Sequence, residues 1–144
     1  MGKSVLFYFC VKSLIRLYRA LLFFINRTKE RKLNMDVKVV RKAETKLSLE
    51  GVEVCREYFS TPKITFGTST LLPGQRGDID IGHPNSHEVF FVVRGHILLL
   101  CEKEGLLYEL FEQDAIIMPE GVTHTLINIG DTEAVISWSK APTD

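Results

Sequence analysis

Side chains that can bind a divalent metal are concentrated in two short stretches of the sequence. The first places His83, His87 and Glu88 within six residues and continues directly as an apolar segment rich in β-branched and aromatic residues. The second contains His124, shortly after a Pro-x-Gly turn. Imidazole and carboxylate groups are common ligands of divalent ions, and three such ligands leave coordination positions open for a substrate. The two stretches therefore predict metal chemistry at the end of a buried strand.

The first stretch can direct only some of these side chains to the inside of the fold. Side chains alternate between the two faces of a strand, so period two places Ile81 and His83 on one face and Asp80 on the other. His87 and Glu88 are neighbours and must point in opposite directions unless a bulge intervenes. One of the two, and not both, can therefore face a metal.

From Met35 onward the sequence is typical of short strands separated by turns. Residues 51–59 alternate with period two, and Pro-Gly and Glu-Gly pairs separate other runs. The predicted strands start at Val37 and Val39 and continue over residues 51–59, 64–72, 79–83, 88–94, 97–101, 106–111, 115–118, 125–129 and 134–139. Roughly nine or ten strands without a long helical pattern predict an antiparallel all-β barrel or jelly roll.

The first stretch resembles the first signature motif of the cupin superfamily. Common cupins carry a histidine two residues before His83, and this sequence has Ile81 there. The usual spacing of the family, with a glutamate five residues after a histidine and seven before Gly95, selects Glu88 as a ligand. A four-histidine subgroup with the pattern His-Pro-x-x-His-Glu selects His87 instead, and this sequence contains that pattern.

The second stretch resembles the second cupin motif at Pro119, Gly121, His124 and Asn128, although Gln113 replaces its opening glycine. The resemblance extends over residues 64–140. It implies an all-β cupin double-stranded β-helix, that is, a jelly-roll barrel.

The resemblance also implies a set of metal ligands. The preferred set is His83, His87 and His124, with Glu88 as the alternative to His87 and Ile81 at the vacant fourth corner. The ion would be Mn, Fe, Ni or Zn, and the alternative is a relic site without metal.

Two functions follow from this resemblance. One is a divalent-metal-dependent enzyme of the isomerase, oxygenase or lyase type that acts on an oxygen-bearing small molecule. The other is a non-catalytic cupin module that binds a ligand or forms homodimers without metal. The barrel alone does not choose between them, because the same fold carries unrelated functions.

The charge distribution separates a leader, residues 1–34, from the cupin domain, residues 35–144. The formal net charge of the chain is zero, but residues 1–34 carry eight Lys/Arg and one Glu. The leader is predicted to be an amphipathic helix or an upstream extension that precedes the true start at Met35, and membrane contact is expected only if it belongs to the working protein. The remaining residues are acidic and show no basic patch, so nucleic acid is not an expected partner.

Two further expectations concern compartment and assembly. Cys10, Cys55 and Cys101 are odd in number and form no CxxC pattern, which indicates reduced thiols and a cytoplasmic location. The strand over residues 52–58 was expected to leave an open sheet edge, and a homodimer would cover it.

Overall fold

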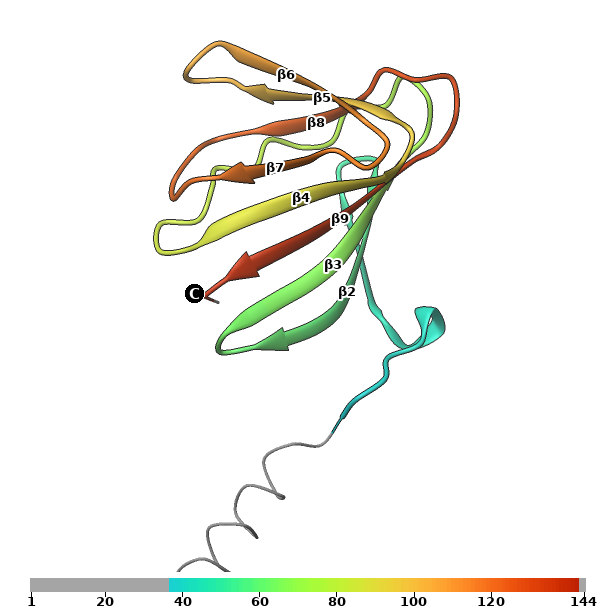
Figure 1. Cartoon of the computed structure of the whole chain (residues 1–144). Helices are drawn as coiled ribbons and strands as arrows, with labels where there is room; N and C mark the ends of the chain where they lie inside the picture. Colours follow the sequence, from blue (N-terminus) through green and yellow to red (C-terminus); the bar gives the residue numbers. More distant parts are fainter. Residues whose placement is uncertain (1–36, 143–144) are drawn as a thin grey trace, which may run out of the picture. The chain divides into compact units, whose positions relative to one another are not determined.

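The computed structural model describes residues 37–142, and their regular structure is almost entirely antiparallel β-sheet (Figure 1). The chain divides into two compact units, Met1–Val39 and Val40–Asp144, and the strands belong to the second. A short 3₁₀ helix at Lys42–Glu44 precedes the first strand, and no helix in this part of the chain is long and apolar enough to cross a membrane. The strands found there are β1 (Lys46–Glu50), β2 (Glu53–Thr61), β3 (Ile64–Leu71), β4 (His87–Arg94), β5 (His96–Cys101), β6 (Leu106–Phe111), β7 (Ala115–Met118), β8 (Thr125–Asn128) and β9 (Ala134–Ala141). The all-β prediction is confirmed, and the predicted leader, residues 1–34, lies outside the described residues.

The strands form two sheets that face each other (Figure 1). The larger sheet has the strand order β1-β2-β3-β9-β4-β7, and the smaller one has the order β6-β5-β8. Strands that are far apart in sequence, such as β3 and β9, are neighbours, as in a jelly roll. Two isolated backbone bridges, Arg76 to Ile127 and Asp80 to His124, fasten the long connection between β3 and β4 along the outer edge of β8. This connection carries His83, one of the candidate metal ligands.

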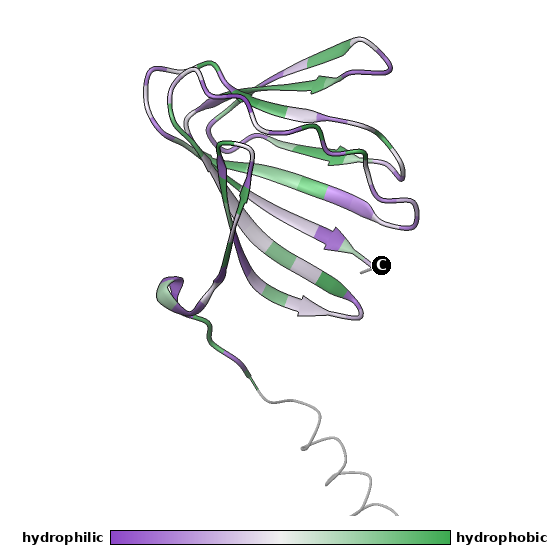
Figure 2. Cartoon of the chain, turned by 180° about the vertical axis from the view of Figure 1, so that it is seen from behind, coloured by the Kyte–Doolittle hydropathy of each residue, from purple (hydrophilic) through white to green (hydrophobic). Residues whose placement is uncertain are grey.

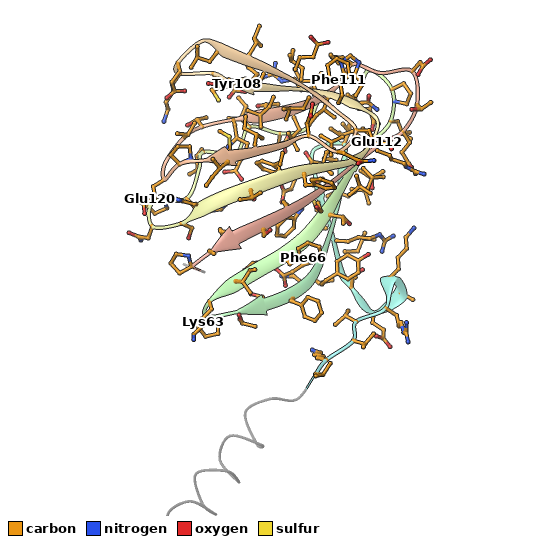
Figure 3. All side chains as sticks on the ribbon, viewed as in Figure 1. Lys63, Phe66, Tyr108, Phe111, Glu112 and Glu120 are labelled. Atoms are coloured by element: carbon orange, nitrogen blue, oxygen red, sulfur yellow. The ribbon has the colours of Figure 1, made fainter. Side chains whose placement is uncertain are left out.

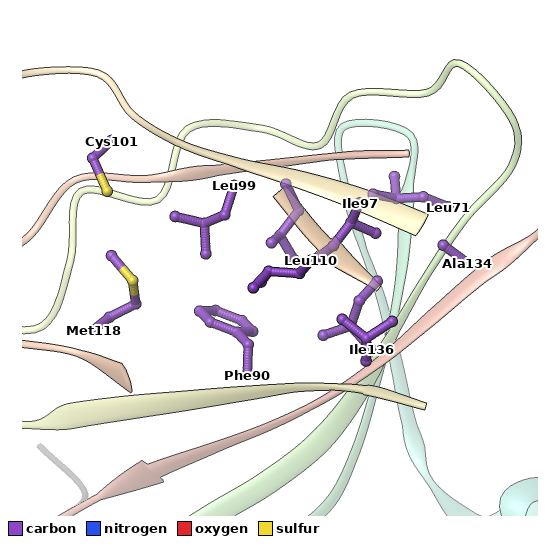
Figure 4. Packing of buried hydrophobic residues seen from close by; sticks show 11 residues of the cluster. Leu71, Phe90, Ile97, Leu99, Cys101, Leu110, Met118, Ala134 and Ile136 are labelled. Carbon is purple, nitrogen blue, oxygen red and sulfur yellow. The ribbon is translucent and has the colours of Figure 1, made fainter. Parts of the chain in front are cut away.

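The hydrophobic core lies between the two sheets (Figure 4). On β4, Phe90 and Val92 are buried, whereas Val89 and Phe91 on the opposite face are exposed. The same alternation occurs along β5, and Figure 2 shows how hydrophobic and hydrophilic residues alternate along the strands. Because burial of one such side chain contributes about 1.5–3 kcal/mol, the core fixes which face of β4 points inward.

The structure corrects three predictions about individual strands. Residues 37–40 form no strand and are largely exposed. Residues 79–83 were predicted to be a strand but form an irregular segment, for a reason given below. Residues 52–58 do not leave an open edge, because β1 pairs with β2 along its whole length. The polar composition of β1 concealed this strand from the sequence pattern.

Candidate metal centre

The segment before β4 reverses the side-chain alternation that the sequence predicted. Gly82 adopts a φ of 79°, and its N–H donates to Oδ1 of Asp80 at 2.7 Å. A Cβ atom on Gly82 would lie 2.7 Å from the backbone of Gly121, so both the lack of space and the positive φ require glycine at this position. The left-handed residue turns Asp80 and His83 to the same cavity and leaves Ile81 78% exposed. The prediction that Ile81 faces inward beside His83, at a vacant fourth corner, is therefore wrong, and Asp80 is at the cavity instead.

The first residues of β4 also point in the directions opposite to those that the preferred ligand set, with His87 facing the metal, requires. Glu88 is 7% exposed and lines the cavity on the same strand face as Phe90. His87 lies on the outer face and is exposed. Of the two alternatives for this ligand, the geometry brings Glu88 to His83 and His124 and does not bring His87 there. Whether either of them binds a metal stays a prediction.

Four potential ligands converge inside the cavity. Nε2 of His83 lies 3.6 Å from Oε2 of Glu88 and 3.8 Å from Oδ2 of Asp80. Nε2 of His124 lies 3.7 Å from the same oxygen of Glu88. This oxygen is buried and accepts no hydrogen bond from the described residues. Two imidazole nitrogens therefore flank a buried oxygen of Glu88 that has no hydrogen-bond donor among residues 37–142.

His124 is held in one tautomer by its backbone neighbour. Nδ1 of His124 lies 3.0 Å from the carbonyl oxygen of Val122, and because a carbonyl can only accept, Nδ1 carries the proton. The lone pair of Nε2 then points towards Glu88. The ring of Phe90 packs edge-on against this imidazole at 5.2 Å between centroids. A second contact that fixes ring orientation and tautomer is typical of metal-binding histidines.

The rest of the second stretch is structural. His124, Leu126 and Asn128 are all buried. The side-chain amide of Asn128 donates to the carbonyls of Leu71 and Thr132, at 2.9 and 2.8 Å. Asn128 thus closes the turn between β8 and β9 and does not reach the metal centre.

Burial controls the protonation of Glu88. The pKa of this carboxyl is raised from its ordinary value of 4.5 to about 8, chiefly by burial and next by the charge of Asp80, while the ammonium group of Lys140 opposes the rise. Lys140 also lies 3.4 Å from Nδ1 of His83, through its Nζ atom. In the absence of a bound cation, Glu88 therefore holds a proton at neutral pH.

Three of these side chains, Asp80, His83 and Glu88, form a group that could hold a divalent ion, and His124 adjoins this group at Glu88. Ligands at about 2.0–2.2 Å from an ion are separated from each other by about 3–3.5 Å, close to the separations found here. The acceptor atoms of Asp80, His83 and Glu88 all lie within 4.8 Å of one another. The orphaned oxygen of Glu88 is the atom that an ion would satisfy. Two imidazoles with one or two carboxylates suit Mn, Fe, Ni or Zn.

Comparison with known proteins defines the class. The model of the cupin domain family matches residues 67–139, just over half of the chain, and the protein therefore belongs to the cupin family. No curated protein matches the chain. Similar solved structures include KdgF from a Halomonas species (17% identity, TM-score 0.62, covering 74% of this chain and 96% of that one). The cupin domain of Schizosaccharomyces pombe Cnp3 is similar too (15% identity, TM-score 0.63, covering 75% of this chain and 76% of that one). So is a predicted oxalate decarboxylase from Thermotoga maritima (18% identity, TM-score 0.63, covering 74% of this chain and 100% of that one). At these identities, the likeness shows the fold alone.

Sequence reasoning missed two residues of the site, Asp80 and Lys140. Asp80 was assigned to the wrong face because strict alternation was assumed, although an Asp-x-Gly sequence is typical of a turn in which the carboxylate accepts from the backbone. Lys140 lies near the end of β9, opposite Glu88 in the strand register. A lysine near the end of the chain gave no signal of its own.

Proposed function

We propose that this cupin is a metal-dependent enzyme whose divalent ion is held by His83, Glu88 and His124, with Asp80 as a fourth ligand. The observation that supports the proposal most directly is the buried oxygen of Glu88, flanked by two imidazole nitrogens and without a hydrogen bond from the described residues. Once this carboxyl loses the proton that it holds in the absence of a cation, its buried oxygen would lack a donor at a cost of about 1–3 kcal/mol or more, and a bound ion would satisfy it.

A bound ion would supply a Lewis acid that polarises an oxygen of a small-molecule substrate, as in isomerase, lyase or oxygenase chemistry. The residues of the chain prepare the site for it. Val122 fixes the tautomer of His124, and Phe90 packs against its ring. Lys140 is the nearest basic side chain to His83 and lines the cavity, where it can donate a proton or a hydrogen bond to the substrate. The cavity, about 180 Å³, suits a small substrate.

The alternative is a non-catalytic cupin that forms homodimers. β1 is the outer strand of the larger sheet, and its Leu47 and Leu49 are exposed. An open strand with apolar side chains is a ready site for pairing with a second copy. Light scattering of wild type and Leu49→Lys would test this: a dimer that becomes monomeric in the variant supports pairing through β1. A wild-type monomer at micromolar concentration would contradict it.

The compartment is a further proposal. Cys55 and Cys101 are free thiols buried in the fold. Unpaired cysteines are typical of reducing compartments, and we propose a cytoplasmic location on this ground.

The metal proposal is tested by metal content after purification without chelator. Wild type is expected to retain about one divalent ion per chain, and Glu88→Gln and His124→Ala are expected to lose it. His87→Ala is the matched control, because this exposed histidine adjoins Glu88 but lies outside the cavity. Metal retained in Glu88→Gln but lost in His87→Ala would refute the ligand assignment. A wild type that takes up no ion even after incubation with Mn, Fe, Ni or Zn would favour the non-catalytic module.

A further inference from the structure

The cavity around the candidate metal centre is far more acidic than a metal ion alone requires. Asp80 and Glu88 belong to the centre itself. Four more carboxyl side chains line the same cavity, namely Glu50, Glu53, Glu57 and Asp78. Lys140 is the one lysine or arginine among the described residues that line it. We call the four additional carboxyl groups the acidic rim.

Three of the four rim residues come from β1 and β2, and the fourth, Asp78, lies in the connection that also carries Asp80 and His83. Glu50 ends β1, and Glu53 and Glu57 lie on the inward face of β2. Acceptor atoms of Glu50, Glu53 and Cys55 lie within 4.8 Å of one another. The thiol of Cys55 donates to Oε1 of Glu53 at 3.6 Å, so one of these carboxylates is already partly satisfied. Glu50 and Glu57 present their charges to the remaining space.

The charge balance favours one kind of ligand. A dication in the centre would be neutralised by Asp80 and Glu88, and Lys140 would offset one more negative charge. The rim then keeps an excess of carboxylates, which would repel an anionic ligand, since like charges brought together cost several kcal/mol. Glu53 is 6% exposed and burial raises its pKa, so the negative charge of the rim comes first from Glu50, Glu57 and Asp78.

The geometry points to a small molecule that carries an ammonium group as the ligand of this cavity, with the ammonium at the acidic rim and an oxygen function at the centre. This inference deepens the proposed function and rests on it for the position of the oxygen. The rim does not stand alone as evidence. Oε2 of Glu88, on a side chain more than nine-tenths buried, points into the same cavity without a hydrogen-bond donor among the described residues. This cavity of about 180 Å³, which both groups line, admits a molecule of a few heavy atoms.

Three probes of equal length that differ in charge at one end test the inference: 4-amino-1-butanol, 1,4-butanediol and 4-hydroxybutanoate. Binding is measured by NMR titration of the full chain, once with metal removed and once with the ion that it retains. The amino alcohol should bind at least about tenfold more tightly than the diol in both states, and the hydroxy acid should bind most weakly. The same ranking without metal would show that the rim acts independently of the centre.

A rim variant and a matched control assign the effect to its residues. Glu50→Gln combined with Glu57→Gln removes two rim charges and keeps the shape of the side chains, and it should abolish the preference for the amino alcohol. Glu112→Gln removes a carboxylate in the exposed turn after β6 (Figure 3) and should leave the preference unchanged. Equal binding of amino alcohol and diol, or tighter binding of the hydroxy acid to metal-free protein, would overturn the inference.

The outcomes separate this inference from the proposed function. If wild type binds no metal but still prefers the amino alcohol, the metal centre is refuted and the ammonium site at the rim is supported. If wild type binds one ion but shows no preference among the probes, the metal centre is supported and the ammonium site is refuted. Two divalent ions per chain in wild type, with one lost in the rim variant, would identify the rim as a second metal site and contradict the ammonium ligand.

Discussion

Replacement of Glu88 by glutamine should have opposite effects on the metal-free and the metal-bound protein. Burial raises the pKa of Glu88 from 4.5 to about 8. Below pH 4.5 the carboxyl is protonated in both the folded and the unfolded chain. Above that pH the unfolded chain releases the proton while the folded chain keeps it, so stability falls as pH rises towards 8. Glutamine has no proton to retain and escapes this loss.

The size of the effect follows from the difference between the two pKa values. Each pH unit above 4.5 costs about 1.4 kcal/mol, so Glu88 lowers the free energy of unfolding by about 3 kcal/mol at pH 7. In chelator, Glu88→Gln should therefore be more stable than wild type by up to this amount, or by about 10 °C in Tm. The gain should shrink as pH falls and vanish near pH 4.5.

Metal should reverse the order. An ion at a thousandfold excess over its Kd stabilises the folded wild type by about 4.1 kcal/mol, which exceeds the lead of about 3 kcal/mol, and should do little for Glu88→Gln. Urea unfolding at several pH values, with chelator and with metal, measures both halves, and the exposed Glu112→Gln serves as the control. A variant less stable than wild type in chelator at pH 7 would refute the reasoning, because Glu88 would then be ionised and paired in the fold.

Three further predictions concern other positions. Gly82→Ala should lower the free energy of unfolding, measured in urea, by about 1–3 kcal/mol, and by more than Gly74→Ala does. Both glycines have positive φ, but only Gly82 lies against neighbouring backbone atoms. Equal losses in the two variants would exclude that close contact as a cause. Glu53→Gln should be more stable than wild type at pH 8 and as stable as wild type near pH 4. Burial raises the pKa of Glu53, so wild type loses stability as pH rises above the ordinary pKa of a glutamate. Thermal unfolding that shows the same difference at every pH would contradict this. Alkylation of Cys55 in the folded protein should be roughly a thousandfold slower than that of a free thiol, because burial raises its pKa to about 12. Mass spectrometry after timed labelling measures the rate, and rapid modification of Cys55 would contradict the prediction.

Periodicity predicted the faces of strands well, but not which face is inside. In β2, period two places Glu53 and Cys55 on one face and Val54 on the other, and the structure has the same grouping. The inward face is the one with the glutamate, because β2 lines a polar cavity and not the apolar core. Hydrophobicity alone would have pointed the other way.

Local backbone geometry explains the error at Asp80. Alternation holds only while every residue is extended, and one residue with positive φ shifts all later side chains to the other face. Gly82 is such a residue. A glycine permits this conformation without requiring it, so the sequence could not show that the strand pattern ends there.

The choice between His87 and Glu88 is decided by the core and not by ligand chemistry. Glu88 shares its strand face with Phe90 and Val92, which are packed between the sheets. A shift of one residue would bring His87 into the cavity, but it would also move both core side chains out and exchange them for Val89 and Phe91. Because both faces of β4 are apolar, the sequence pattern allows either arrangement. Only the pairing of β4 with β7 and β9, which sets Phe90 against Ile116 and Trp138, selects one. The candidate ligand at the start of the strand is thus a consequence of packing several residues further along it. A variant that repacks Phe90 should disturb the candidate metal centre without changing any of its proposed ligands.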